Sequence, residues 1–305
     1  DPRTMLWKDI YNPREYDLKG LNLTAEQQPY IRPIQTKVGA MISLVEAAGI
    51  VTQNSAKGGN DILSNIKLRA VRASLMIRPS KKSKVAEACN TVQCPAFYDK
   101  TNSDIWSLED SRNPGAHLSN ILFRCIDMEY EALERQNASI VFEMVIAVPK
   151  PGGDDSMNEM TVGWAELPLS QLDQAQTLRL EVKGGSPAGV TDIKSEDVKA
   201  ERSGYRYFTQ MVAGNGSGLT VRVEPYTRLA DEQKFHMDLM PGTCLLHAEL
   251  LQFCSAFMNY KGKHCLSTEY GSMAFKKPPG DVIISTFPML LDNPDICEFM
   301  ALCWK

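Results

Sequence analysis

The stretch from Asn137 to Tyr226 constrains the fold most, because it consists of short apolar segments separated by turn residues. Its first segment, Ala138–Val148, is an almost uninterrupted apolar run, which is typical of a strand covered on both faces. The alternation in Thr177–Val182 predicts a strand with one solvated face. The strand candidates here are Ala138–Val148, Val162–Leu169, Thr177–Val182, Tyr205–Val212 and Gly218–Tyr226. Such short strands with Gly, Pro and Asn in their connections favour an antiparallel β-sandwich.

Two further strands are predicted upstream of this stretch. Ile66–Ile77 alternates, with a phase change near Ala70, and indicates a long bent strand. Ile121–Met128 adds another strand, and residues 79–118 between them are expected to be loop. The number and spacing of strands between residues 64 and 226 favour a mainly β fold, a C2-like or immunoglobulin-like antiparallel β-sandwich.

Helices are predicted on both sides of the sandwich. Residues 1–32 are expected to form an extended arm, and the apolar stripe in Pro33–Ala48 predicts an amphipathic helix. Cys244–Met258 has a similar stripe, with Thr243 as a candidate cap. Ser285–Leu291 and Asn293–Trp304 predict two more helices, each with a capping residue and an early proline. The expected domains are an N-terminal arm and amphipathic helix (1–60), a C2-like β-sandwich (61–228) and a C-terminal helical region (229–305).

Charge and composition argue against several classes of protein. The 305 residues carry a formal net charge of −4, and the pI is about 5.7, whereas a nucleic-acid binder needs a basic face. No apolar run approaches the ~18 residues of a membrane span. The eight cysteines form no dense framework, which indicates free thiols and a reducing compartment. A chain that begins Asp1-Pro2 is expected to be part of a longer protein.

Two groups of residues could form a metal site, and each also has a simpler interpretation. A C2-type sandwich invites a calcium site, but no Asp-x-Asp pair stands at a strand end, so Asp99, Asp104, Asp110, Asp154 and Asp155 are interpreted as solvated loop residues. On a helix, Cys244, His247 and Cys254 would share an arc of roughly 80°, because each residue turns the helix by about 100°. His264 and Cys265 could then supply further zinc ligands. Core packing is the favoured interpretation of this set, and neither metal nor cofactor is expected.

No motif in the sequence demands an enzyme. Gly214–Gly218 lacks the glycine pattern and lysine of a phosphate loop, and it fits the tip of a hairpin. The chain has only four histidines, and the sequence signals no nucleophile and base pair. Gly163 is expected to permit close packing, and Trp164 to fill the sandwich core. We therefore expect a non-enzymatic protein without catalytic residues.

The order of motifs between about residues 160 and 304 resembles the C-terminal nephrocystin homology region of the nephrocystin-1 family. The motifs that carry the resemblance are Gly163-Trp164, Gly184-Gly185-Ser186-Pro187, Tyr207–Met211, Thr220–Val223, Thr286–Leu291 and Pro294-Asp295. Residues 61–148 are compatible with the family, and residues 1–60 match weakly. The family's amino-terminal coiled coil and SH3 domain have no counterpart here. The resemblance therefore implies either the carboxy-terminal part of such a protein or a divergent relative.

What the resemblance implies is a structural scaffold or adaptor of the cilium, in the cytoplasm and cytoskeleton of a cell projection. Family members lie at the ciliary transition zone; a divergent relative could instead work along axonemal microtubules. The implied partners are other ciliary proteins, such as a nephrocystin-4-like partner and cytoskeletal or microtubule-associated proteins. The alternative is a C2-like peripheral lipid-binding module that works without calcium and contacts the membrane through Lys81, Lys82 and Lys84.

Overall fold

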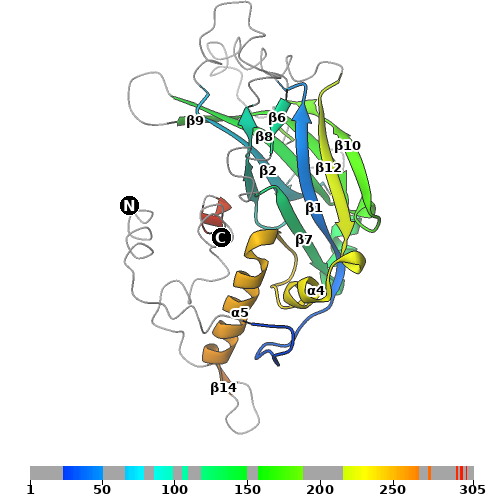
Figure 1. Ribbon diagram of the computed structural model, residues 1–305. Coiled ribbons are helices and arrows are strands. Elements are labelled where there is room, and N and C mark those ends of the chain that lie inside the picture. Colours follow the sequence, from blue (N-terminus) through cyan, green and yellow to red (C-terminus); the bar gives the residue numbers. More distant parts are fainter. Residues whose placement is uncertain are drawn as a thin grey trace, which may run out of the picture.

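The computed structural model describes residues 23–50, 66–78, 86–98, 105–108, 118–149, 157–187, 216–267, 274–275, 293–294, 296–297 and 300. Within these residues the protein is mainly β, with two antiparallel sheets and few helices (Figure 1). A two-stranded ribbon of β14 (Leu266–Ser267) and β15 (Ala274–Phe275) stands apart from both sheets.

The first sheet, sheet A, is arranged around one long strand, β1 (Thr36–Ala48). On one side β1 pairs with β12 along most of its length, and on the other side it pairs first with β7 and then with β6. The remaining strands of sheet A are β5 (Phe97–Tyr98), β6 (Ile105–Ser107), β7 (Asn120–Ile126), β10 (Gln176–Glu181), β12 (Gly218–Pro225) and β13 (Cys244–His247). All of these pairings are antiparallel.

The second sheet, sheet B, is arranged around β8 (Ser139–Pro149), which pairs with β2 on one side and β9 on the other. The β8 and β9 pairing contains an irregularity between Met144 and Val145. The remaining strands of sheet B are β2 (Leu68–Ile77), β3 (Ala86–Glu87), β4 (Val92–Pro95), β9 (Met157–Pro168) and β11 (Lys183–Gly184).

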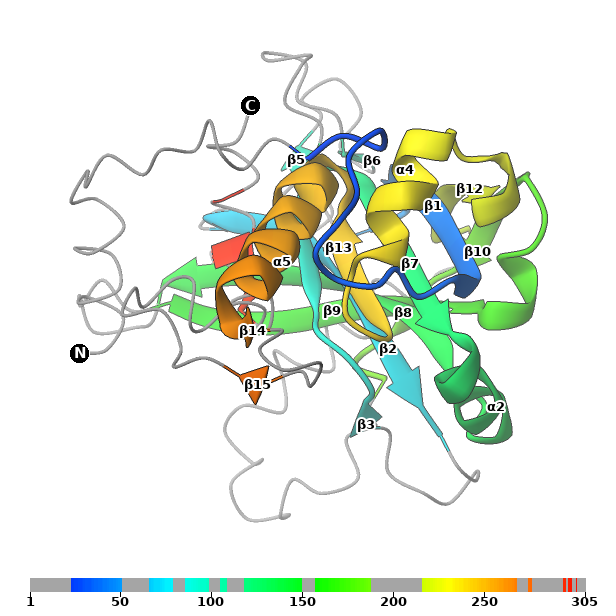
Figure 2. The same ribbon diagram turned by 90° about the horizontal axis from the view of Figure 1, so that it is seen from below.

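Helical elements connect the strands, and two of them, α4 and α5, lie against sheet A. The helical elements are α2 (Asp127–Arg135), η3 (Leu169–Gln171), η4 (Tyr226–Arg228), α4 (Asp231–Asp238), η5 (Ala248–Leu250) and α5 (Leu251–Cys265). Seen from below, α4 and α5 lie beside β7 and β13 (Figure 2). None of the helices in the described part of the chain is sufficiently long and apolar to span a membrane.

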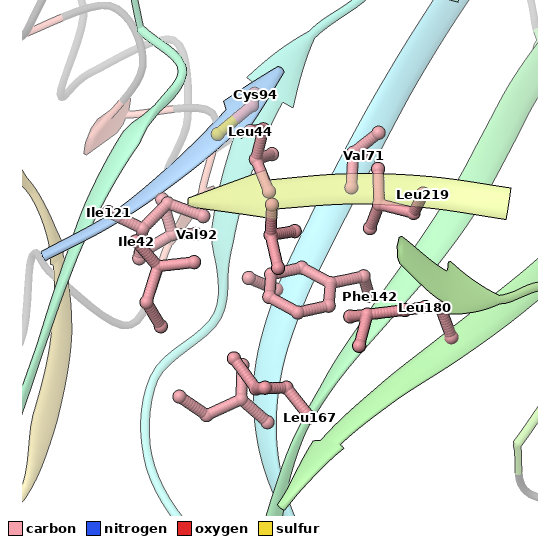
Figure 3. Packing of buried hydrophobic residues seen from close by; sticks show 14 of the residues in the cluster. Ile42, Leu44, Val71, Val92, Cys94, Ile121, Phe142, Leu167, Leu180 and Leu219 are labelled. Carbon is pink, nitrogen blue, oxygen red and sulfur yellow. The ribbon is translucent and has the colours of Figure 1, made fainter. Parts of the chain in front are cut away.

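The main apolar cluster receives side chains from both sheets. In Figure 3, Ile42, Ile121 and Leu219 of sheet A lie with Val71 and Phe142 of sheet B. All five side chains are almost completely removed from solvent. Burying each one contributes about 1.5–3 kcal/mol before the entropy of ordering it is subtracted. Six of the predicted strands are present in the structure. They are β2 (predicted as Ile66–Ile77), β7 (Ile121–Met128), β8 (Ala138–Val148), β9 (Val162–Leu169), β10 (Thr177–Val182) and β12 (Gly218–Tyr226).

The helix predicted over Pro33–Ala48 is wrong, because Thr36–Ala48 is the strand β1. Ala40, Ile42 and Leu44 face the main cluster, while Met41 packs against a second apolar cluster on the other face. A strand with apolar residues on both faces loses its alternation, and Ile34, Val38, Met41, Ile42 and Val45 then happen to match a helical stripe.

Two other predicted boundaries also differ from the structure. The loop expected over residues 79–118 contains β3, β4, β5 and β6. The helix expected over Cys244–Met258 starts only at η5 and α5, because Cys244–His247 pairs with β7 as strand β13. Since β1 and β13 both belong to sheet A, that sheet includes residues from all three expected domains. The helices α2 and α4 were not predicted.

The last predicted helix is described at a few positions. Pro294, Ile296, Cys297 and Met300 are helical, and Asn293 caps this turn through its side-chain oxygen, which accepts from Ile296 N at 3.1 Å. The helical positions described here follow Asn293, and the other residues of the predicted helix lie outside the described residues. The arm up to residue 22, the strand Tyr205–Val212 and the helix Ser285–Leu291 lie outside the described residues.

Candidate functional site

Polar side chains gather at the face of sheet A that points away from sheet B, and two of them, Thr36 and Arg124, are buried. Along β7, Ile121 and Phe123 belong to the main cluster, whereas Leu122 belongs to a second apolar cluster shared with α4 and α5. Because side chains alternate along a strand, Arg124 lies on the same face as Leu122. We call the polar residues gathered here the polar junction: Thr36, Arg124, Glu129, Tyr226, Asp238 and Thr243.

Arg124 is the most buried charged side chain of the polar junction, with 2% of its surface exposed. Its guanidinium donates through Nη1 to the carbonyl oxygen of Met240 and through Nη2 to that of Ile34. Burial lowers the pKa of Arg124 from its ordinary value, and neighbouring acidic groups, Asp238 among them, oppose this effect. The side chain therefore ties β7 to the segment before β1 and to the turn after α4, which is a structural role.

Asp238, at the end of α4, holds the start of β1. Its Oδ1 accepts hydrogen bonds from Thr36 N at 2.9 Å and from Thr36 Oγ1 at 2.8 Å. The Tyr226 hydroxyl donates to both carboxylate oxygens, at 3.2 and 3.1 Å. Burial, followed by the charge of Asp238 and this hydrogen bond, raises the pKa of Tyr226 to about 12. The phenol therefore stays protonated as a donor at neutral pH.

Thr243, the candidate cap, is held by α2 instead. The Glu129 carboxylate accepts from Thr243 N at 2.7 Å and also from Thr243 Oγ1. Thr243 Oγ1 in turn lies 3.3 Å from the Cys125 sulfur. Burial raises the pKa of the Cys125 thiol, so this cysteine is a weak nucleophile.

His236 and Ser255 form a close histidine and serine pair that no motif in the sequence predicted. His236 Nδ1 lies 2.7 Å from Ser255 Oγ, and Glu232 Oε1 lies 3.9 Å from His236 Nε2. A serine nucleophile must reach its substrate, yet Ser255 is 0% and His236 1% exposed. The Ser255 hydroxyl also donates to the Gln252 carbonyl at 3.0 Å. The pair therefore joins α4 to α5 and is not catalytic.

The candidate zinc ligands do not lie on one helix face, which is the arrangement that a zinc site at these residues would need. Cys244 and His247 lie on strand β13 and Cys254 lies on α5, so the three do not share one helix face. Within the described residues, no group of three or more potential ligands lies close enough to hold a metal ion. Burial raises the pKa of Cys244 to about 12 and that of Cys254 well above its usual value, which disfavours the thiolates that zinc requires. The side chains of His264 and Cys265 lie outside the described residues.

The described cysteines agree with the expectation of free thiols. The free cysteines are Cys89, Cys94, Cys125, Cys244, Cys254 and Cys297. All except Cys89 are buried. Cys94 and Cys125 belong to the main cluster and Cys244, Cys254 and Cys297 to the second, and Cys89 packs against the main cluster. These thiols behave as small apolar side chains.

Trp164 does not fill the sandwich core, so that prediction is wrong. Its ring is only partly buried, and Lys183 Nζ lies 4.5 Å from the ring centroid in a cation–π contact. Lys183 also lies 3.9 Å from the Glu166 carboxylate. The tryptophan that occupies the core is Trp106 of β6, which is 1% exposed. Gly163 is buried and pairs with Gly184, which agrees with the expected close packing.

Several candidate loop sites lie outside the described residues. These are the lysines of the lipid-binding alternative, Lys81, Lys82 and Lys84, and the candidate calcium ligands Asp99, Asp104, Asp110, Asp154 and Asp155. Of the Gly214–Gly218 loop, the structure describes the last three residues. There the Gly216 carbonyl accepts from Arg179 Nη2 at 2.6 Å, and the Ser217 hydroxyl donates to Gly49 O at 2.7 Å. These contacts within the chain are those expected of a structural turn.

Comparison with known proteins assigns no family. No protein-family model matches the chain, and no curated protein matches it.

Proposed function

We propose that this protein is a non-enzymatic structural scaffold of the cilium, built on a C2-like or immunoglobulin-like sandwich. It would dock other ciliary proteins at the transition zone or on axonemal microtubules, with a nephrocystin-4-like protein or a microtubule-associated protein as the partner. The resemblance of its motifs to the nephrocystin-1 family supports the cellular location. The role of a binding module is supported by the geometry of one strand, β10.

The observation that carries the binding role is the edge of β10. Among the described residues, only β12 pairs with this strand. In an antiparallel pair, residues whose N–H and C=O both point at the partner strand alternate with residues whose groups both point away. Val182 N donates to Ser217 O at 3.3 Å, which continues the pairing of β10 with β12. Leu178 and Leu180 share the parity of Val182, so their backbone groups also point at β12.

The intervening residues, Thr177, Arg179 and Glu181, therefore direct their backbone donors and acceptors away from β12. Their side chains are exposed, whereas Leu178 and Leu180 pack on the main cluster. An edge of this kind is the usual template for β-augmentation, in which an extended segment of a partner adds a strand. Backbone hydrogen bonds would supply the affinity, and apolar side chains beside Leu178 and Leu180 would extend the core.

A proline at Thr177 tests this proposal. Thr177→Pro removes an N–H that points away from β12, and edge strands tolerate proline at such positions. Thr177→Ala is the matched control, because it removes the same side chain and keeps the N–H. Proximity labelling and fluorescence localisation of the tagged wild type and both variants in ciliated cells would be compared, together with thermal melts of the purified proteins.

We expect the wild type and Thr177→Ala to label ciliary proteins equally, and Thr177→Pro to lose a subset of them by about tenfold, with an unchanged melt. Signal at the ciliary base would assign the transition zone, and signal along the shaft would assign the axoneme. Labelling without any ciliary proteins would refute the location. Equal labelling by all three proteins would refute docking through β10.

A further inference from the structure

The contact between α4 and α5 contains a buried histidine whose two ring nitrogens are in very different situations. Ser255 donates its hydroxyl proton to the Gln252 carbonyl, at 3.0 Å, so the short contact between His236 and Ser255 requires Nδ1–H as the donor. This tautomer leaves Nε2 as an acceptor. Nε2 is buried and has no hydrogen-bond partner among the residues that the structure describes. The neutral ring is therefore only half satisfied in the position where it joins the two helices.

One carboxylate faces the unsatisfied nitrogen. Glu232 Oε1, one turn earlier on α4, lies 3.9 Å from Nε2 and accepts from Gln252 Nε2 of α5 at 3.2 Å. From α5, the uncharged Ser255 contacts His236 and the uncharged Gln252 contacts Glu232. The ring of Phe235, on α4 itself, lies edge-on to the imidazole with 5.3 Å between the ring centroids. Other charged groups of this region are engaged elsewhere: Asp238 with Thr36 and Tyr226, and Asp231 with Lys234.

We infer that His236 is a pH-sensitive clasp between α4 and α5, which holds the helices together when the ring is neutral and loosens α4 when the ring is protonated. A protonated ring would be a charge enclosed between two helices, with a largely exposed carboxylate beyond hydrogen-bond distance as its counter-ion. Burial lowers the pKa of His236, and Glu232 offsets only part of this effect. Lowering the pH therefore favours the state in which the His236 ring is protonated and exposed to water.

Loosening α4 would affect more than one contact, because α4 also holds the start of β1. The Asp238 carboxylate binds Thr36, and its carbonyl accepts from Ile34 N at 2.8 Å. The same helix supplies Met237 to the second apolar cluster. Protonation of one ring would thus release the segment before β1 together with the cover on the outer face of sheet A.

The test is amide hydrogen exchange of the full chain, followed by mass spectrometry between about pH 7.5 and 5.5 and corrected for the intrinsic rate. Protection of residues 231–238 should fall toward acid by up to about tenfold per pH unit, the limit for one proton. The helix α2 (Asp127–Arg135) is the internal reference and should not change. His236→Asn keeps a donor near the position of Nδ1 and cannot titrate in this range. In this variant, the protection of the α4 amides from exchange should therefore not depend on pH.

Glu232→Gln keeps the size of the side chain and removes the negative charge. Because that charge raises the pKa of His236, the acid transition of this variant should move to lower pH. If His236 had only a structural role, Glu232→Gln would not shift the pH of this transition. The inference is overturned if α4 of the wild type shows no pH dependence relative to α2, or if His236→Asn keeps the same dependence. If His236→Asn does not fold, Glu232→Gln alone tests the inference: a transition shifted to lower pH supports it, and an unshifted transition or one shifted to higher pH overturns it.

Discussion

Asp238 is the residue at which the polar junction can be perturbed most informatively. Its carboxylate accepts hydrogen bonds from Thr36 N, Thr36 Oγ1 and the Tyr226 hydroxyl. Thr36 is 4% exposed, so in Asp238→Ala its two donors would stay buried without an acceptor. Each such donor costs about 1–3 kcal/mol. Tyr226 is partly exposed, and water can replace its lost partner at lower cost.

We therefore expect Asp238→Ala to lower the free energy of unfolding by about 3 kcal/mol, mainly through Thr36. Asp238→Asn is the matched variant, because it keeps an acceptor oxygen at the position of Oδ1 for Thr36 and Tyr226, while it loses the charge and replaces the Oδ2 acceptor with an amide nitrogen. It should be destabilised by about 1 kcal/mol. Urea unfolding followed by circular dichroism would measure both values, with the slope confirming that the surface exposed on unfolding is unchanged.

A second observable separates the local effect from a general loss of packing. The charge of Asp238 and its hydrogen bond raise the pKa of Tyr226, after burial as the first cause. In folded Asp238→Ala the pKa of Tyr226 should fall from about 12 toward its ordinary value, as measured by ultraviolet absorbance. Destabilisation of Asp238→Ala by less than about 1 kcal/mol, or an unchanged Tyr226 pKa, would contradict the proposed hydrogen-bond network.

Two further predictions follow from the same structure. Trp106→Ala should destabilise the protein by about 3–5 kcal/mol in urea unfolding, because it opens a cavity in the main cluster, whereas the half-buried Trp164→Ala should cost only about 1 kcal/mol. An equal loss of stability in the two variants would contradict the placement of Trp106 in the core and of Trp164 outside it. Between pH 10 and about 12, unfolded Tyr226 loses its proton before folded Tyr226 does, so stability should decline as pH rises through this window. Tyr226→Phe is the control and should lack this part of the decline.

The sequence predicted strands well where their surroundings left a clear pattern. In β10 one face is exposed, and its alternation identified it. In β8 both faces are buried, but the apolar run is long, rich in β-branched residues and bounded by polar or turn residues. The shorter strands β3, β5 and β6 contain two or three residues each, which is too few for any period to be visible. They exist because longer neighbours pair with them.

The candidate site was less predictable, because its contacts join residues far apart in the chain. Arg124 meets Ile34 and Met240, and Asp238 meets Thr36, across separations that no local pattern encodes. His236 and Ser255 are nearer in sequence, but a strand and a turn lie between their helices. Core packing, the interpretation favoured for the cysteine and histidine set, agrees with the burial of Cys244, His247 and Cys254. The helix that would have aligned them for zinc is wrong, because Cys244–His247 is a strand.

The two main errors, at β1 and at β13, have one physical cause. In each strand, alternate residues enter the main cluster, as Ile42 and Leu245 do, while their neighbours Met41 and Leu246 contact the second cluster. A strand that lies between two apolar clusters has no polar face, so its sequence cannot be told from a buried helix by periodicity. This also means that the helices α4 and α5 are not an appendage of sheet A. They cover a face that the residues of β1, β7 and β13 have made apolar, and removing them would expose it. The helices and sheet A should therefore unfold together, and the contacts of Arg124, Asp238 and His236 determine how firmly the cover is held.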